Sequence, residues 1–325
     1  MRQRQLELSV AGRPGKIRNS MESATATESI ASPDLSKVVI AHDPHDSSEW
    51  QGVFGREARD SAILLGDALA ILKKIPTGSF QSTITSPPYW SLRDYGIEGQ
   101  IGAENSVEAY ISNLVELFDE VRRVTRDDGT LWLNIGDSYT SGGRTWRAPD
   151  KKNPIRAMDT RPPTPPGLKP KDLIGVPWRL AFALQEAGWY LRSDLIWHKP
   201  NCQPESVKDR PTRAHEYLFL FSKSERYKYD AEAVRGPNER NLRTVWEVRT
   251  RPYREAHFAT FPVELISPAV LLSTSDQDLI LDPFLGSGTT GLVALRAQRR
   301  FVGMEINPDY VAIAENRLNL VDEGA

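Results

Sequence analysis

Two adjacent prolines, Pro87 and Pro88, constrain the fold more than any other feature of this sequence. They directly follow residues 82–85, a run rich in β-branched side chains that indicates a buried strand. Proline has no N–H to donate to a neighbouring strand, so the strand must end there. In open α/β sheets, ligands bind at the carboxyl ends of strands. The prolines therefore predict that Ser86 and Tyr89 face a ligand site.

The groups that follow this strand suit a planar ring that carries an amino group. A serine hydroxyl and proline carbonyls accept hydrogen bonds, and a tyrosine ring offers a flat face for stacking. The exocyclic amine of cytosine or adenine is a poor nucleophile, because its lone pair is delocalised into the ring. If Ser86 and the Pro87 carbonyl accept its two N–H bonds, the nitrogen can pyramidalise and direct its lone pair at an electrophile. Once methylated, the nitrogen is acidic and can lose its proton to water, so no strong base is needed.

A second ligand site is predicted near the end of the sequence, where Gly286, Gly288 and Gly291 match the pattern G-x-G-x-x-G. A strand signal at residues 278–282 precedes the pattern, and a helix signal at 292–298 follows it. Glycines in such a turn let a ligand approach the backbone closely. The pattern alone does not separate a nicotinamide enzyme from other proteins that bind an adenine cofactor.

Two carboxylates narrow the choice of ligand. Glu305 ends the strand signal after the glycines, where a carboxylate suits a ribose diol. Asp282 precedes the glycines, and its charge suits an ammonium or sulfonium group rather than a pyrophosphate. A phosphate-binding loop would need a lysine before Ser287 or Thr289, and little sequence follows for the rest of a dinucleotide domain. These features favour S-adenosyl-L-methionine as the cofactor.

Strand and helix signals alternate along most of the chain and predict an α/β fold. Strands are expected at residues 63–65, 82–85, 130–135, 191–197, 216–222, 278–282 and 300–305. Helices are expected at residues 68–72, 107–125, 173–187, 262–272 and 292–298, the second of them stopped by residues 127–129. The strands at 191–197 and 216–222 are expected to form the antiparallel end of a mixed sheet.

The two predicted sites resemble motifs of the DNA amino-methyltransferases, which methylate N4 of cytosine or N6 of adenine. Ser86-Pro87-Pro88-Tyr89 resembles motif IV of that family. Residues 282–290 resemble motif I, residues 302–308 motif II, residues 66–67 motif III and residues 257–262 motif X. The motif order III, IV, X, I, II is that of the circularly permuted β group, and the resemblance covers residues 60 to 320.

The resemblance implies a fold, a cofactor and a set of site residues. The fold is the seven-stranded mixed sheet of the S-adenosylmethionine-dependent methyltransferases (Rossmann-like), with the Pro-Pro strand beside the glycine-loop strand. The implied catalytic residues are Ser86, Pro87, Pro88 and Tyr89. The residues implied to bind S-adenosyl-L-methionine are Asp67, His257, Phe261, Pro262, Asp282, Phe284, Gly286, Gly288, Thr289, Glu305 and Asn307.

Double-stranded DNA is the implied partner, and the target base must leave the duplex to reach Tyr89. The net charge of −2 argues against a general polyanion binder but permits local basic faces. Basic insertions at residues 140–172 and 224–256 are the candidate recognition segments within a catalytic domain at 51–325, preceded by a loose arm at 1–50. The candidate DNA contacts are Arg144, Arg147, Lys151, Lys152, Arg240 and Arg243.

The sequence analysis favours a site-specific, cytosine-N4 DNA methyltransferase of restriction-modification or phage type, because the motif begins with Ser86. An adenine-N6 enzyme is the alternative within the family, and a NAD-dependent oxidoreductase or a catalytically silent DNA-binding module are alternatives outside it. A separate cognate endonuclease, a monomer or dimer, no metal, no membrane and a cytoplasmic, nucleoid-associated location are expected.

Several other residues attract attention. The single cysteine, Cys202, permits no internal disulfide and lacks the Pro-Cys context that a ring-carbon methyltransferase needs for its nucleophile. His198 and His215 lie at predicted strand ends, where a hydrogen-bonded structural role is favoured over acid-base catalysis. Trp90 and Trp132 are predicted to be core or pocket-wall residues.

Overall fold

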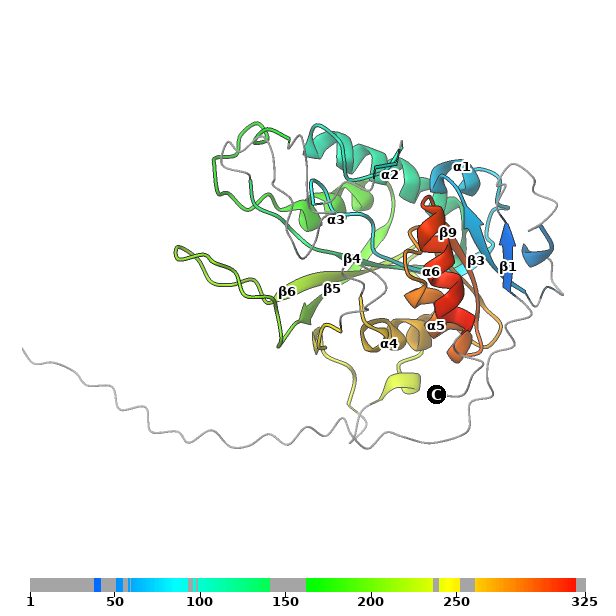
Figure 1. Cartoon of the computed structure of the whole chain (residues 1–325). Coiled ribbons are helices and arrows are strands. Elements are labelled where there is room, and N and C mark those ends of the chain that lie inside the picture. Colours follow the sequence, from blue (N-terminus) through cyan, green and yellow to red (C-terminus); the bar gives the residue numbers. More distant parts are fainter. Residues whose placement is uncertain are drawn as a thin grey trace, which may run out of the picture. The chain divides into compact units, whose positions relative to one another are not determined.

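Alternating strands and helices build one mixed sheet with helices on both faces in the computed structural model of the chain (Figure 1). The structure describes residues 38–41, 51–54, 58, 60–92, 96–97, 99–140, 162–235, 240–251 and 261–319. The strands are β1 (Val38–Ala41), β2 (Ser61–Leu65), β3 (Phe80–Thr85), β4 (Thr125–Ile135), β5 (Tyr190–His198), β6 (His215–Ser222), β7 (Val245–Glu247), β8 (Leu279–Asp282) and β9 (Arg300–Glu305). The helices are α1 (Ala68–Leu72), α2 (Val107–Val124), α3 (Val176–Glu186), α4 (Val263–Ser273), α5 (Thr289–Arg296), α6 (Pro308–Asn319) and the 3-10 helices η2 (Gln51–Phe54) and η4 (Glu232–Val234).

The strand order is β1-β2-β9-β8-β3-β4-β6-β5-β7. All pairs are parallel except those of β6, which runs antiparallel to both β4 and β5. The predicted antiparallel pair and the predicted neighbourhood of the Pro-Pro strand β3 and the glycine-loop strand β8 are both confirmed. Because β6 is reversed, it begins at the edge where the other strands end. We call this the carboxyl edge of the sheet.

Every predicted strand and helix is present, but α2 ends earlier than expected. The predicted stop at residues 127–129 is wrong, since the backbone is already extended at Thr125. The Thr125 hydroxyl donates to the Val121 carbonyl at 2.7 Å, and this carbonyl also accepts the Thr125 backbone N–H, so both groups of Thr125 close the last helical turn. Strand β4 then begins at once, with an irregularity opposite residues 80–82 of β3.

The sequence analysis does not predict the edge strands β1 and β7. β1 pairs in parallel with β2, so the loose arm cannot extend to residue 50 and the domain boundary at 51 is too late. β7 lies in the segment 224–256, where Trp246 is buried and stacks on Trp132 with ring centroids 6.3 Å apart. Strands of four and three residues are too short to show an alternating pattern. The described sheet therefore has nine strands rather than seven, and both additions are at its ends.

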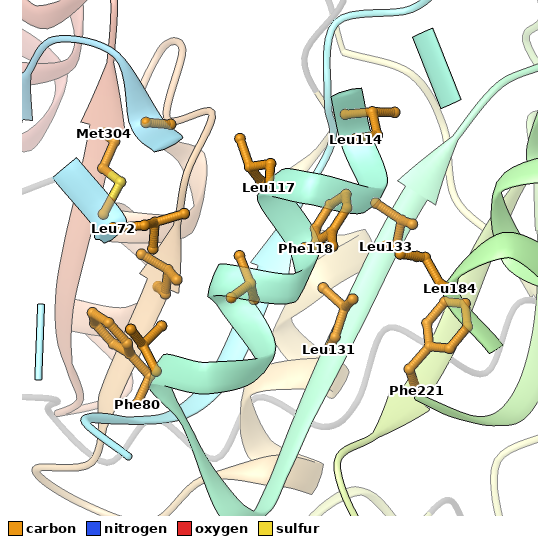
Figure 2. Close-up of a cluster of buried hydrophobic side chains, with 14 of the residues drawn as sticks. Leu72, Phe80, Leu114, Leu117, Phe118, Leu131, Leu133, Leu184, Phe221 and Met304 are labelled. Carbon is orange, nitrogen blue, oxygen red and sulfur yellow. The ribbon is translucent and has the colours of Figure 1, made fainter. Parts of the chain in front are cut away.

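Two apolar layers hold the helices on the sheet. Helices α1, α2 and α3 cover one face, where Leu114, Leu117 and Phe118 of α2 pack against β4 (Figure 2). Helices α4, α5 and α6 cover the other face. Ser106 begins α2, because its hydroxyl accepts the Ala109 N–H at 3.1 Å. Within the described residues, no helix is long and apolar enough to cross a membrane.

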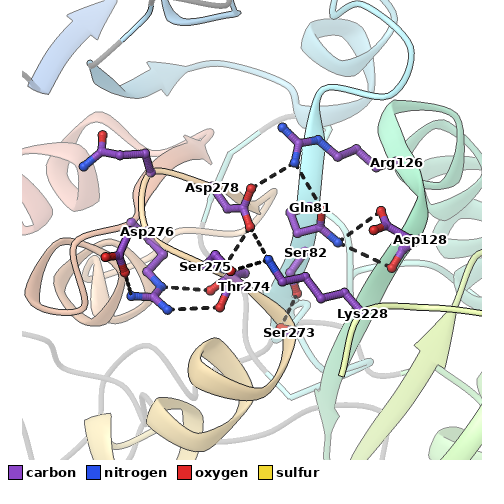
Figure 3. Close-up of polar contacts among 12 residues, drawn as sticks. Gln81, Ser82, Arg126, Asp128, Lys228, Ser273, Thr274, Ser275, Asp276 and Asp278 are labelled. Atoms are coloured by element: carbon purple, nitrogen blue, oxygen red, sulfur yellow. Dashed lines mark hydrogen bonds and ion pairs between the residues drawn. The ribbon is translucent and has the colours of Figure 1, made fainter. Parts of the chain in front are cut away.

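Asp278 joins three segments at the opposite edge of the sheet, just before β8 (Figure 3). Its carboxylate accepts from Arg126 and Lys228, each at 2.9 Å, and from the Ser275 N–H at 2.8 Å. Burial alone would raise the pKa of Asp278, but the bond from Lys228, the bond from Ser275 and the nearby positive charges outweigh it and lower the pKa. The ionised form therefore stabilises the fold.

We expect Asp278→Asn to lower the free energy of unfolding by about 2 kcal/mol at neutral pH, because two cations lose their shared carboxylate. A carboxyl group with a lowered pKa stabilises the fold above its unfolded pKa, and this is lost as pH falls through the folded pKa. The difference between the variant and the wild type should therefore shrink in acid. Urea unfolding at several pH values measures it.

Asp127→Asn is the matched control, because the Asp127 side chain is 94% exposed and forms a surface ion pair with Lys223 at 3.3 Å. It should change stability by less than about 0.5 kcal/mol. Equal losses for the two variants would show that Asp278 has no special role.

Candidate active site

The residues after β3 form the first part of the site. Tyr110 donates its hydroxyl to the Pro88 carbonyl at 2.8 Å, and the Trp90 indole donates to the Glu104 carbonyl at 2.9 Å. These bonds fix the turn and occupy the Pro88 carbonyl. Among the residues that the structure describes, no donor reaches the Pro87 carbonyl. The Pro87 carbonyl and the Ser86 hydroxyl remain as the acceptors that the amine site needs.

Tyr89 is held by groups from β4 and β6. Its hydroxyl lies 2.8 Å from Glu216 Oε2 and 3.3 Å from Asn134 Oδ1. Burial raises the pKa of Tyr89 well above its usual value, the charge of Glu216 raises it further, and a hydrogen bond with the Ser86 hydroxyl lowers it. Tyr89 is therefore a neutral phenol. A Cβ on Gly136 would lie 2.7 Å from Tyr89 Cε2, so the ring packs directly on a glycine backbone at the end of β4.

The glycine loop lies at the carboxyl edge between β8 and α5. Gly286 (φ +53°) and Gly288 (φ +79°) adopt left-handed backbone conformations that favour glycine. Gly291 lies in α5, and a Cβ there would come within 2.8 Å of the Phe301 ring on β9. The third glycine of the pattern thus permits close packing of the helix on the sheet, as the resemblance to a cofactor-binding turn requires.

Glu305 at the end of β9 accepts hydrogen bonds from the backbone of this loop and of the turn after β9. Its Oε2 accepts the Gly286 N–H and its Oε1 accepts the Asn307 N–H, both at 2.9 Å. Burial raises the pKa of Glu305 to about 7, although these N–H groups lower it, and the charge of Asp282 adds to the rise. The remaining lone pairs of a carboxylate at this place can accept hydrogen bonds from a diol.

Asp282 joins the two predicted sites. Its Oδ1 accepts from the Thr85 hydroxyl at 2.7 Å, and its Oδ2 accepts from the Thr290 hydroxyl at 2.6 Å. The Phe284 N–H also donates to Oδ1 at 3.1 Å. Burial raises the pKa of Asp282 to about 6, and these three bonds oppose the rise. The side chain is 1% exposed, so its predicted contact with a ligand's ammonium group is not supported.

The other predicted cofactor residues occupy the same edge or its surroundings. Asp67 follows β2 and is exposed, and its carboxylate accepts the Ala70 N–H at 2.8 Å. The neighbouring Gly66 N–H donates to the Glu305 carbonyl at 2.8 Å, so these two parts of the predicted site are adjacent. The Thr289 hydroxyl accepts from Arg317 at 2.7 Å, and Asn307 Oδ1 accepts the Asp309 N–H at 2.9 Å.

The remaining predicted residues flank the helices. Pro262 is buried and begins α4, Phe261 packs against the core on the α4 face, and Phe284 packs against the core on the α2 face. Arg240 and Arg243 are exposed. The predicted residues that lie outside the described parts of the chain are Arg144, Arg147, Lys151, Lys152 and His257.

The sequence analysis assigns no site role to Glu216, which the structure places against Tyr89 and Asn134. On β6, Phe219 and Phe221 face one core, whereas Leu218 and Leu220 face the other. Glu216 lies on the same face of β6 as those leucines. A carboxylate at a core-facing position indicates a charge that is paired or hydrogen-bonded. Its neighbour His215 has a lowered pKa, because burial and the charges of Arg213 and Lys199 disfavour its protonation.

The comparisons with known proteins agree with this geometry. Residues 80–316 match the DNA methylase family of N6 and N4 methyltransferases. The chain is 61% identical over 266 residues to Type II methyltransferase M.Cfr9I of Citrobacter freundii, covering 81% of this chain and 89% of that protein. It is 57% identical over 266 residues to Type II methyltransferase M.SmaI of Serratia marcescens, covering 80% and 91%.

Two solved structures share the fold. One is the PvuII DNA methyltransferase (cytosine-N4-specific), with a TM-score of 0.60, 22% identity and coverage of 80% of this chain and 90% of that one. The other is a candidate DNA modification methylase from Thermus thermophilus complexed with S-adenosyl-L-methionine, with a TM-score of 0.58, 25% identity and coverage of 81% and 95%. The nicotinamide oxidoreductase alternative is therefore wrong. The S-adenosylmethionine-dependent methyltransferase fold is confirmed, and the chain belongs to the DNA methylase family of N4 and N6 amino-methyltransferases.

Proposed function

We propose that this DNA methyltransferase transfers a methyl group from S-adenosyl-L-methionine to N4 of a flipped-out cytosine in duplex DNA. The observation that carries the proposal is the acceptor pair after β3, the Ser86 hydroxyl and the Pro87 carbonyl, directly beside the glycine-loop strand. Two acceptors for one amine match the chemistry of an exocyclic nitrogen. Serine at the first position of the motif favours cytosine, and adenine-N6 is the alternative for the same site.

The chain's own residues prepare the nitrogen for attack. Bound S-adenosyl-L-methionine supplies the electrophilic methyl group. Ser86 and the Pro87 carbonyl accept the two N–H bonds of the amine, which frees the nitrogen lone pair from the ring, and Tyr89 stacks on the base. The lone pair forms the new bond to carbon, the sulfur takes up the electrons of the bond it loses, and one N–H proton leaves to water.

The glycine loop and its carboxylates suit the cofactor. Close approach is possible at Gly286 and Gly288, and Glu305 can accept from the ribose hydroxyls. Asp67 at the adjoining end of β2 suits the adenine end, and Phe261 and Pro262 suit the methionine end. Asp282 acts behind the loop by holding it to β3.

We also propose partners and a cellular location for the enzyme. Similar proteins are Type II methyltransferases, and a site-specific methyltransferase of that type works beside a separate endonuclease for the same DNA sequence. Sequence recognition is assigned to the segments 140–172 and 224–256, and the protein acts at the nucleoid. The protein is expected to act as a monomer or dimer.

The product identifies the target base. DNA methylated by the purified protein and digested to nucleosides should contain N4-methylcytosine, measured by mass spectrometry. N6-methyladenine would retain the cofactor site and mechanism but show that Ser86 does not select cytosine. The absence of any methylated base, with the cofactor bound and several DNA sequences tried, would favour the catalytically silent DNA-binding module.

Cofactor binding should weaken in acid because of Glu305. Its raised pKa of about 7 means that the carboxylate, the form that accepts two ribose hydroxyls, is lost as pH falls from 8 to 6. Calorimetry should show about fivefold to tenfold weaker binding at pH 6 than at pH 8. Glu305→Gln should bind more weakly at pH 8 but lose this fall, since it cannot titrate there. The variant and the wild type share the cofactor's own ionisation, so an identical fall in both would exclude Glu305 as the cause.

The exposed arginines Arg240 and Arg243 should contribute to DNA binding through phosphate contacts. The double alanine variant should reduce the slope of log affinity against log salt by about two, measured by fluorescence anisotropy. Arg296→Ala is the control, because Arg296 is exposed at the end of α5 remote from the glycine loop. An unchanged affinity and slope in the double variant would remove these residues from the DNA interface.

A further inference from the structure

The last described helix, α6, packs on the loop that is proposed to bind the cofactor. Helices α5 and α6 lie side by side (Figure 1). A Cβ on Gly288 would lie 3.1 Å from Ala314 Cβ, so α6 meets the backbone of the glycine loop directly. Arg317, about one turn further along α6, extends its side chain to the same loop. The sequence analysis assigns no role to either of these α6 residues.

One nitrogen of the Arg317 guanidinium joins three oxygens of the loop. Nη1 donates to the Ser287 hydroxyl at 2.8 Å and to the Thr289 hydroxyl at 2.7 Å, and a weaker bond reaches the Ser287 carbonyl at 3.2 Å. These oxygens lie on both sides of Gly288, whose φ of +79° turns the chain into α5. Ser287 and Thr289 are 1% and 3% exposed, so water does not compete for them. A single side chain therefore fixes the loop on both sides of its turn.

The charge of Arg317 is favourable for α6 but not for α5. Arg317 lies in the last turn of α6, where a cation suits the negative end of the helix dipole. Its guanidinium reaches the first turn of α5, where the dipole disfavours a cation and which holds no acidic side chain. The electrostatics of α5 oppose this arrangement, so the bonds to the loop explain it.

The other supports of the loop come from the sheet. Glu305 on β9 accepts the N–H of the first glycine at 2.9 Å, and Asp282 on β8 accepts from the threonine that follows Thr289 at 2.6 Å. Of the residues that the structure describes, only Arg317 forms hydrogen bonds with the side chains of Ser287 and Thr289. The middle of the loop therefore depends on α6.

We infer that Arg317 is a positioning residue, which holds the glycine loop in the conformation that binds S-adenosyl-L-methionine. The inference rests on the proposed role of this loop as the cofactor site. A ligand that lies against the backbone requires the loop in one conformation. A loop that is ordered before binding loses less entropy when the ligand binds, so the affinity is higher. Arg317 acts through Ser287 and Thr289 and not by contact with the reacting atoms.

Arg317→Met tests this role, because methionine keeps an unbranched apolar stem and removes every donor. We expect the variant to bind S-adenosyl-L-methionine about tenfold more weakly in calorimetry. The rate of methyl transfer in single turnovers at saturating cofactor should stay within about twofold of the wild type, because the residues after β3 are unchanged. A general loss of structure would lower this rate as well. An unchanged affinity in the folded variant, or a rate that falls with the affinity, would overturn the inference.

Thr289→Val tests whether Arg317 acts through the loop. Valine keeps the shape of threonine and removes the hydroxyl that accepts from Arg317. We expect this change to weaken cofactor binding about threefold in the wild type and to cause no further loss in Arg317→Met. Losses that multiply would show that the two side chains act separately, which contradicts the inference.

Arg296→Met is the matched control, since Arg296 is exposed in the last turn of α5 and should keep the wild-type affinity. If Arg317→Met does not fold, the double variant Ser287→Ala with Thr289→Val removes both hydroxyl acceptors instead, and a wild-type affinity in it would overturn the inference. Weaker binding in Glu305→Gln at pH 8, with unchanged binding in Arg317→Met, contradicts only the role of Arg317. Unchanged binding in both variants would contradict the proposed role of the loop itself.

Discussion

The buried carboxylate of Asp282 is the interaction on which the arrangement of the two sites depends. Thr85 ends the strand that leads into Ser86, and Thr290 lies in the helix that follows the glycine loop. Both hydroxyls donate to Asp282 at 2.6–2.7 Å, where water cannot compete. Loss of one partner would leave a desolvated charge without a donor, which costs more than the bond contributes. The segment after β3 and the glycine loop are thereby held in register across neighbouring strands.

Strand order brings together groups that the chain order separates. β3 and β8 are separated by about 200 positions in the sequence, yet they pair in the middle of the sheet. The reversed strand β6 begins where β4 ends, which places Glu216 beside Asn134 and within reach of Tyr89. A parallel strand at that position would present its first residues at the opposite edge. The single reversal in the described sheet thus places the Glu216 carboxylate beside the Tyr89 hydroxyl.

The sequence predicts the parts of this molecule that local chemistry determines. The prolines after β3, the glycines before α5 and the strand-end residues Asp67 and Glu305 all identify the carboxyl edge. The features that the sequence does not predict depend on tertiary pairing. β1 and β7 are too short to carry a pattern, and the partners of Glu216 come from three other strands or their ends. The sequence identifies Asp282 as a site residue. The direction of its side chain depends on Thr85 and Thr290, which lie 197 and 8 positions away along the chain.

Three carboxylates at the same edge have different roles because their donors differ. Two neutral hydroxyls and an N–H donate to Asp282, so it joins β3 to the glycine loop and its helix. Two backbone N–H groups donate to Glu305, one to each oxygen, and burial raises its pKa to about 7, which suits the ligand-binding role proposed for it. A cation, Lys199, holds Glu216, which also accepts the hydrogen of the Tyr89 hydroxyl. The identity of the donors, rather than burial alone, therefore distinguishes these three acids.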